Sequence, residues 1–233
     1  MRLTFSHSQA EASNIKTFFF EPEQEIDYTA GQYIELTIKH PRPDERGIKH
    51  WFTLSSSPTD ALVSITTKFS EPSSTFKKAL ANLSRGDKVD FNGPFGDFVL
   101  PKLIQTPLVF VAGGIGITPF HSILSWLIAN HEQRPIKLIY GVKNEDEIIF
   151  LDVFKRADQP VSIVVENPSD SWGGEMGKLN ADLILGIGQP TEDSLVYVSG
   201  PEPMVEALEK ELIKKGIKKS QLVLDFFPNY TSI

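Results

Sequence analysis

The pattern of hydrophobic and polar positions changes character near residue 101. Residues 31–40, GQYIELTIKH, alternate aliphatic positions with polar or aromatic ones, as expected of a strand with one buried face. Residues 61–69 and 86–100 are also rich in strand-forming residues and are bounded by Gly or Pro. Short strands separated by turn residues are typical of a small antiparallel barrel, which we expect in this part of the chain.

Strands and helices alternate in the second half of the chain. Residues 107–114, PLVFVAGG, form the continuous apolar run of a strand covered on both faces, and residues 119–131 are long enough for the helix that follows. The same pattern recurs with strands at 136–142, 161–167 and 194–200 and helices at 147–154 and 201–216. It predicts an open parallel sheet, with ligands beyond the carboxyl ends of its strands. We therefore predict two domains, an antiparallel β-barrel over 1–102 and an α/β domain over 103–233.

Composition narrows the possible chemistry. The chain has 233 residues and no cysteine, which excludes disulfides, thiolate nucleophiles and cysteine-ligated metal clusters within it. Its five histidines have no metal-ligand spacing, and no Gly-x-Ser-x-Gly motif is present, so we expect no metal site and no serine hydrolase. Redox chemistry would need an organic cofactor.

Charge and hydropathy also limit the expected partners and location. A formal net charge of −7, with lysines and arginines scattered except for the run at 214–219, argues against nucleic acid. That basic run is typical of the solvated end of a helix. No apolar stretch reaches membrane-spanning length, and the first residues lack the apolar core of a secretion signal, so we expect a cytoplasmic protein.

A glycine-rich turn, GGIGITP, follows the first strand of the second half. Gly114 and Gly116 match the first two glycines of the dinucleotide-binding fingerprint, but Pro119 occupies the third place, so a plain NAD-dehydrogenase pattern is excluded. Gly113 also permits close backbone approach, and we expect Thr118 to be the N-cap of the next helix. Such a turn suits a pyrophosphate at a helix N-terminus. The alternative is a tight turn with no ligand.

GGIGITP resembles the pyrophosphate turn of the ferredoxin–NADP reductase superfamily, in which a flavin-binding barrel precedes a nicotinamide-nucleotide domain. HWFTLSSSP, starting at residue 50, resembles the Arg-x-Tyr-Ser flavin motif of that family. The resemblance implies that Phe52 packs on the isoalloxazine and that the Thr53 hydroxyl lies near its reactive nitrogen. His50 replaces the arginine that pairs with the flavin phosphates, and a mostly neutral imidazole cannot offer a bidentate cationic fork. Lys49 or Lys68 is a candidate to carry that charge instead.

SITTKF followed by EPSSTFKKAL resembles the second flavin element of the family, a strand and then a Gly-x-x-Ser turn that opens a helix. Ser74 is well placed to cap this helix and to leave N–H groups for phosphate. Glu71 stands where the family has glycine. The element fits FAD better than FMN, and a helix cap without a ligand is the alternative. GPFGDFVL, at 93–100, resembles the closing strand of the barrel.

VSGPEPMV, at 198–205, resembles the Cys-Gly-Pro-x-x-Met segment that the family places beside the nicotinamide, with Ser199 in place of cysteine. LDFFPNY resembles the terminal acidic-x-aromatic segment, with Asp225 and Phe227 in those two places. Tyr230 is a further candidate to cover the flavin face. After the strand IKLIYGV, Lys143 would attract a 2′-phosphate whereas the acidic run that begins at residue 145 would repel one, so NADPH and NADH both remain open.

The resemblance implies a flavoprotein reductase in which NAD(P)H reduces bound FAD, which then passes electrons to a separate acceptor such as a small redox protein, an oxygenase or a membrane component. The implied catalytic residues are Thr53, Ser199, Asp225 and Phe227. The implied cofactor-binding residues are His50, Trp51, Phe52, Thr53, Thr66, Lys68, Ser73, Ser74, Thr75, Gly113, Gly114, Gly116, Thr118, Lys143, Gly200 and Pro201. Two alternatives stay open: a reductase of free flavins and a non-catalytic nucleotide-binding subunit.

Overall fold

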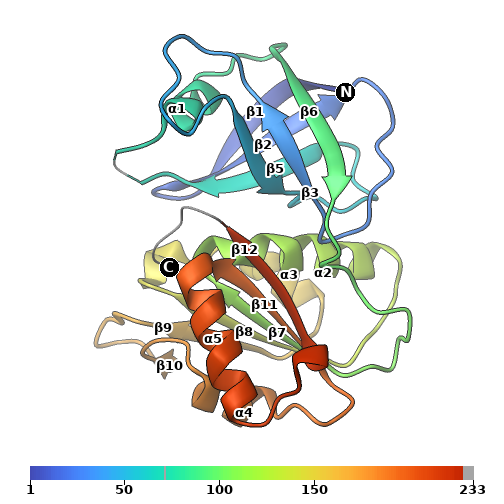
Figure 1. Cartoon of the computed structure of the whole chain (residues 1–233), viewed down its shortest axis with the longest axis vertical. Helices are drawn as coiled ribbons and strands as arrows, with labels where there is room; N and C mark the ends of the chain where they lie inside the picture. Colours follow the sequence, from blue (N-terminus) through green and yellow to red (C-terminus); the bar gives the residue numbers. More distant parts are fainter. Residues whose placement is uncertain (71, 228–233) are drawn as a thin grey trace.

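The computed structural model describes residues 1–70 and 72–227, which form two domains stacked along the longest axis of the molecule (Figure 1). The first domain is a six-stranded antiparallel sheet in the order β4-β3-β6-β1-β2-β5. A bridge between Leu54, just after β4, and Ile65 of β5 joins the two outer strands. The predicted antiparallel barrel is confirmed. Its strands are β1 (Arg2–Ala12), β2 (Ile15–Pro22), β3 (Tyr33–Thr37), β4 (Lys49–Thr53), β5 (Val63–Lys68) and β6 (Lys88–Phe95).

Alternating side chains fill the barrel interior. In β3, Ile34 and Leu36 are fully buried, whereas the residues between them face outward, as the sequence pattern predicts. Helix α1 (Thr75–Ala81) buries Phe76 and Leu80 against the same core. It begins after Ser74, whose side chain accepts a hydrogen bond from the backbone N–H of Lys77, so the predicted cap is confirmed.

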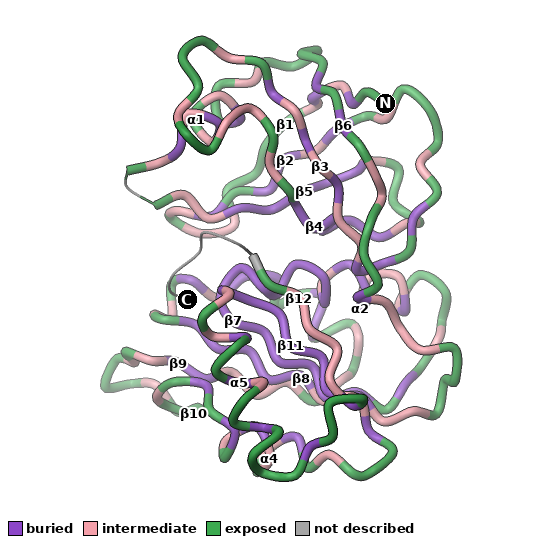
Figure 2. The backbone as a smooth tube through the Cα atoms, in the orientation of Figure 1, coloured by how far each residue is buried: buried purple, intermediate pink, exposed green. Residues whose placement is uncertain are grey.

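The second domain is a parallel sheet in the order β10-β9-β8-β7-β11-β12, which confirms the predicted α/β architecture. Successive residues of the central strand β7 face opposite sides: Phe110 packs with α2 and α3, and Val109 packs with α4 and α5. Figure 2 shows that the central strands are buried along most of their length. The elements are β7 (Leu108–Gly113), α2 (Thr118–Ala129), β8 (Ile136–Val142), α3 (Leu151–Arg156), β9 (Val161–Val165), β10 (Glu175–Met176), α4 (Ala181–Gly188), β11 (Leu195–Pro201), α5 (Glu202–Lys214) and β12 (Leu222–Phe227), with 3₁₀ turns η1 (Gly114–Ile117), η2 (Glu145–Glu147) and η3 (Lys219–Gln221).

The predicted helix over 147–154 is wrong at its beginning. Residues Glu145–Glu147 form a 3₁₀ turn, and α3 starts only at Leu151. Phe150 adopts a left-handed backbone conformation with φ of 63°, which interrupts any continuous helix at that position. The basic run at 214–219 follows the end of α5 at Lys214, as predicted.

Helix α2 lies directly under the barrel and connects the domains by hydrogen bonds (Figure 1). Ser122 Oγ donates to the Ser56 carbonyl at 2.5 Å, and His121 Nδ1 donates to the Ser55 carbonyl at 2.6 Å. The predicted boundary at 102/103 falls between β6 and β7, and its position stays a prediction. Each helix within residues 1–70 and 72–227 is too short or too polar to span a bilayer.

Candidate functional site

A cleft of about 540 Å³ lies between the two domains. The barrel supplies one wall from β3, β4, β5 and α1, and the second domain supplies the other from the glycine turn and β12. The predicted site residues that line it are His50, Trp51, Phe52, Thr53, Thr66, Thr118 and Asp225. The structure therefore brings residues from both halves of the sequence to one cavity.

Strand β4 forms the barrel wall of this cleft. Phe52 packs in the barrel core, where its ring centroid lies 5.8 Å from that of Phe76, and although it is only 7% exposed it also lines the cleft. Trp51 points the other way and is 58% exposed. Thr53, at the end of the strand, is buried at the base of the cleft. The wall thus offers aromatic surface and one hydroxyl.

The neighbouring wall residue Thr66 belongs to a buried chain of hydroxyl groups. Its Oγ1 donates to Ser55 Oγ at 2.9 Å and lies 2.9 Å from Thr17 Oγ1. Ser55 Oγ in turn lies 3.1 Å from Ser64 Oγ. Because buried hydroxyls that satisfy one another hold a fixed geometry, this network stabilises the β5 side of the cleft.

The two lysines predicted to replace the family arginine are both paired with carboxylates. Lys49 Nζ lies 2.9 Å from Glu35 Oε1, and Lys68 Nζ lies 2.8 Å from Glu147 Oε2 of the second domain. Two other cations that the sequence reasoning missed, Arg46 and Lys77, line the cleft beside His50. Lys77 could have been found from the sequence, because it lies three residues after the Ser74 cap of a helix expected to bind phosphate. Arg46 lies in a loop, and no sequence pattern indicates that it lines the cleft.

His50 is half-buried, and its buried Nε2 atom has no hydrogen-bond partner among the described residues. Burial, and then the positive charges of Lys77 and Arg46, lower the pKa of its imidazole, which is therefore neutral at pH 7. Buried polar atoms in native proteins are nearly always paired. An unpaired nitrogen beside two cations fits the phosphate oxygens of a flavin nucleotide.

The glycine turn meets the end of β11 at very short range. A Cβ atom at Gly116 would lie 2.2 Å from the Ser199 carbonyl oxygen, so only glycine fits there. Gly114 has φ of 52° and begins η1, which runs directly into α2. The predicted N-cap role of Thr118 is wrong, because it is already helical and its Oγ1 donates to the Ile115 carbonyl. Close packing therefore explains part of the glycine pattern without a ligand.

Ser199 and Asp225 are direct neighbours on β11 and β12. Ser199 Oγ donates to Asp225 Oδ2 at 3.2 Å. Burial raises the pKa of Asp225 to about 6, the Ser199 hydrogen bond opposes this rise, and the nearby Asp97 carboxylate adds to it. Phe227 lies at the end of β12 opposite Pro201, and Glu71 and Tyr230 lie outside the described residues.

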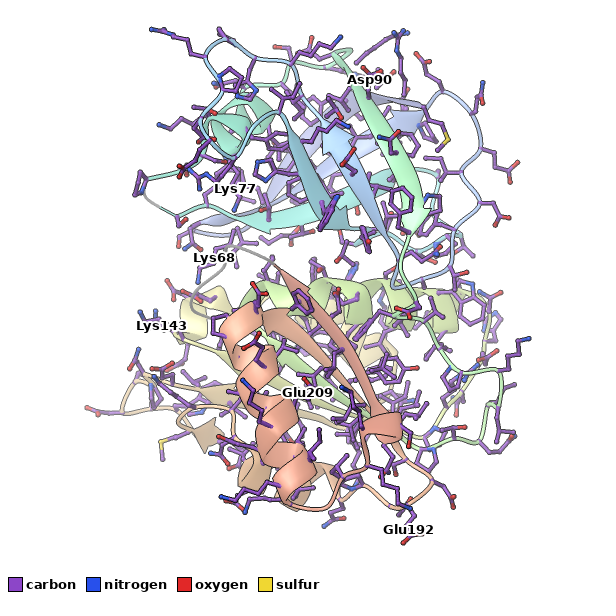
Figure 3. The ribbon with its side chains drawn as sticks, viewed as in Figure 1. Lys68, Lys77, Asp90, Lys143, Glu192 and Glu209 are labelled. Carbon is purple, nitrogen blue, oxygen red and sulfur yellow. The ribbon has the colours of Figure 1, made fainter. Side chains whose placement is uncertain are left out.

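The remaining predicted residues lie near the cleft or away from it. The Thr75 backbone N–H, which the sequence reasoning left for phosphate, donates to Asp44 Oδ2 at 2.9 Å. Ser73 Oγ donates to the Ser70 carbonyl, and Lys143 is exposed on the second domain, with Lys68 and Lys77 on the same side of the molecule (Figure 3). Those not among the cleft-lining residues are Lys68, Ser73, Ser74, Thr75, Gly113, Gly114, Gly116, Lys143, Ser199, Gly200 and Pro201. The described residues contain no cluster of potential metal ligands.

Two family models match the chain, one to each domain. The oxidoreductase FAD-binding domain matches residues 2–100, and the oxidoreductase NAD-binding domain matches residues 110–210. These two domains, in this order around a shared cleft, define an FAD- and NAD(P)-binding oxidoreductase module.

Known proteins agree with this class. Flavohemoprotein A of Dictyostelium discoideum is 29% identical over 96% of this chain and 59% of its own length, so the chain spans about three-fifths of that relative. NADH-cytochrome b5 reductase 1 of Coccidioides immitis is 29% identical over 87% of this chain and 69% of its own length. The fold matches a ferredoxin NADP+ reductase from Neisseria gonorrhoeae with TM-score 0.80 and 18% identity, over 97% of this chain and 98% of that one. The chain is thus an oxidoreductase with an FAD-binding and an NAD-binding domain, and it has the fold of a ferredoxin NADP+ reductase.

Proposed function

We propose that this chain is a reductase module that takes electrons from NADH or NADPH and passes them, through bound FAD, to a separate acceptor. The observation that carries the proposal is the shared cleft, bordered by Thr53 from the FAD-binding domain and Asp225 from the NAD-binding domain. Flavin supplies the chemistry that links a two-electron hydride donor to one-electron acceptors. The chain supplies binding, orientation and electrostatics.

Thr53 and Trp51 are proposed to act on the flavin ring. The Thr53 hydroxyl, buried at the base of the cleft, would donate a hydrogen bond to the ring and stabilise negative charge there. Trp51 offers an exposed aromatic face beside it. Because β4 is paired along its length with β3, both side chains are held in place by the sheet.

Ser199 and Asp225 are proposed to position the nicotinamide against the flavin. Their hydrogen bond of 3.2 Å fixes both side chains at the carboxyl ends of β11 and β12, which is where parallel sheets place their ligands. The glycine turn at 113–116 lies at the end of the adjacent strand β7 and would hold the pyrophosphate. Close positioning of donor and acceptor lowers the hydride-transfer barrier.

We further propose that NADH is the preferred coenzyme. Acidic residues follow β8, among them Glu145 and Asp146, whereas Lys143 is the one cation that directly follows that strand. Glu145 is fixed there by the Ser169 backbone N–H, which donates to its carboxylate at 2.7 Å. A carboxylate at this place accepts hydrogen bonds from ribose hydroxyls and repels a 2′-phosphate.

The visible spectrum of the purified protein, followed by anaerobic titration with NADH and NADPH, tests the proposal. Flavin bands that bleach on titration support a reductase with bound FAD and rank the coenzymes. A colourless protein that oxidises NADH only when flavin is added would favour the free-flavin reductase instead. Inertness even with added FAD would favour the non-catalytic subunit. The cytoplasmic location stays a prediction, which cell fractionation tests.

A further inference from the structure

The end of the cleft beside α1 brings together three nitrogen-bearing side chains from separate segments. His50 comes from β4, Arg46 from the loop before it, and Lys77 from α1. The His50 ring is held by Phe76, with ring centroids 4.3 Å apart. Figure 3 shows Lys77 on the side of the barrel near the second domain. This end of the cleft therefore has a fixed imidazole between two cationic side chains.

His50 points to a ligand with hydrogen-bonding oxygen atoms. Its Nε2 atom is buried and has no partner within the described part of the chain, which is unfavourable unless something outside the chain pairs with it. Burial, and then the charges of Lys77 and Arg46, lower the pKa of His50, so the imidazole does not itself supply positive charge at pH 7. Lys77 Nζ already donates to the Lys68 carbonyl at 2.5 Å, but an ammonium group has three N–H donors. An anionic acceptor would pair with His50 Nε2 and with further N–H donors of the two cations.

Arg46 is oriented by its own loop and remains able to bind. Its Nη2 atom lies 3.1 Å from Asp44 Oδ2, and Asp44 is held in turn by the Thr75 backbone N–H. A guanidinium has five N–H donors, so this ion pair leaves others available, and the side chain is 40% exposed. Lys49 also borders the cleft, but Glu35 offsets its charge at 2.9 Å.

We propose that Arg46 and Lys77 hold the phosphate groups of bound FAD, with His50 Nε2 as a hydrogen-bond donor to the same groups. The inference rests on the FAD site of the proposed function and names the cationic side chains that would bind the FAD phosphates there. In this chain the phosphate-binding charge then lies in the loop before β4 and on α1, not on β4 itself. The loss of a cation at position 50 is compensated by two cations from neighbouring segments.

The test is the dissociation constant of FAD, FMN and riboflavin, measured by fluorescence titration on the full chain freed of flavin. Arg46→Gln and Lys77→Gln should each weaken FAD and FMN binding by about 5- to 20-fold, since each removes a charge-assisted contact. Riboflavin has no phosphate, so its binding should change by less than about twofold. Lys78→Gln, on the exposed side of the same helix, is the matched control and should leave all three constants unchanged.

Conservative variants separate charge from structure. Arg46→Lys and Lys77→Arg keep the charge and should retain most of the affinity, and thermal unfolding checks that every variant folds. His50→Arg adds a cation beside two others and should tighten FAD binding by less than about threefold. A gain in FAD affinity above about tenfold in His50→Arg, or unchanged FAD binding in both glutamine variants, would contradict this inference but not the proposed function. Failure of the wild-type chain to bind any flavin contradicts the proposed function as well.

Discussion

At the scale of single residues, the proposed role of the buried Thr53 hydroxyl can be tested by one substitution. Thr53→Val keeps the shape of the side chain and removes the donor, so flavin reduction should slow by at least about 10-fold, since a hydrogen bond to a charged group contributes about 1.5–3 kcal/mol. Flavin binding should persist because the rest of β4 is unchanged. Stopped-flow absorbance under anaerobic NADH measures the rate, and Thr53→Ser should retain it. An unchanged rate in Thr53→Val would contradict the proposal that the Thr53 hydroxyl stabilises negative charge on the flavin.

Asp225 gives a prediction about stability and pH. Its pKa rises from 3.8 to about 6 in the folded chain, so the folded state binds the proton more tightly than the unfolded state. The stabilisation from this proton is therefore complete below about pH 4 and is lost as the pH rises through about 6. Asp225→Asn cannot ionise, and it should unfold at a higher temperature than the wild type at pH 8.

The matching measurement at low pH is the control for this prediction. Below about pH 4 the Asp225→Asn advantage in unfolding temperature should largely vanish, because Asp225 is then protonated in both the folded and the unfolded wild type. Ser199→Ala removes the hydrogen bond that opposes the shift and should move the transition to higher pH. Equal unfolding temperatures of Asp225→Asn and wild type at pH 8 would contradict the raised pKa.

At the scale of elements, the turn between β7 and α2 is held by the close approach of β11. Gly116→Ala would place a Cβ atom 2.2 Å from the Ser199 carbonyl oxygen, and backbone must shift to relieve the contact. We expect a loss of about 1–3 kcal/mol in the free energy of unfolding, as for other overpacked sites. Urea denaturation measures it. Gly186→Ala, in α4 with nothing within 4 Å of the added atom, should be neutral or slightly stabilising.

The segment after β8 should determine coenzyme choice. We expect the wild type to use NADH at least about 10-fold better than NADPH in kcat/KM, because Glu145 and Asp146 would repel the 2′-phosphate. Replacing both by Gln and Asn should narrow the preference, mainly through a lower KM for NADPH. Asp152→Asn, on the exposed face of α3, removes one negative charge elsewhere and should leave the preference unchanged. A wild-type preference for NADPH would contradict this assignment.

Sequence reasoning predicted what regular periodicity encodes and missed what depends on tertiary contacts. The alternation in β3 and the apolar run of β7 were enough to predict a barrel followed by a parallel sheet. Ser74 was recognised as a cap because its signal is local. The prediction that Thr118 is the N-cap of α2 was wrong because η1 continues directly into α2, a connection fixed by the packing of Gly116. Arg46 was missed because a loop residue reaches the cleft only through the fold.

At the scale of the whole molecule, an ion pair between Lys68 and Glu147 connects the two domains. Lys68 of β5 and Glu147 of η2 lie 2.8 Å apart, with side chains only 18% and 10% exposed. Sequence reasoning assigned Lys68 to the cofactor, whereas the structure places its ammonium group against the second domain. Because both charges are largely removed from water, removing either side chain would leave the other charge buried without a partner.

A double-mutant cycle on this pair should show strong coupling. Lys68→Met leaves the Glu147 carboxylate buried without its cation and should cost about 3 kcal/mol of unfolding free energy, whereas Lys68→Met/Glu147→Met should cost clearly less. The exposed pair of Lys88 and Glu23, within the barrel, is the matched control and should show much weaker coupling, because water screens both charges. Since the cleft exists only while the domains hold their relative placement, the single variant should also slow flavin reduction, and the double variant should recover part of that rate. Additive costs in the cycle would mean that the hydrogen bonds from α2 to the barrel, and not this ion pair, hold the two walls of the cleft together.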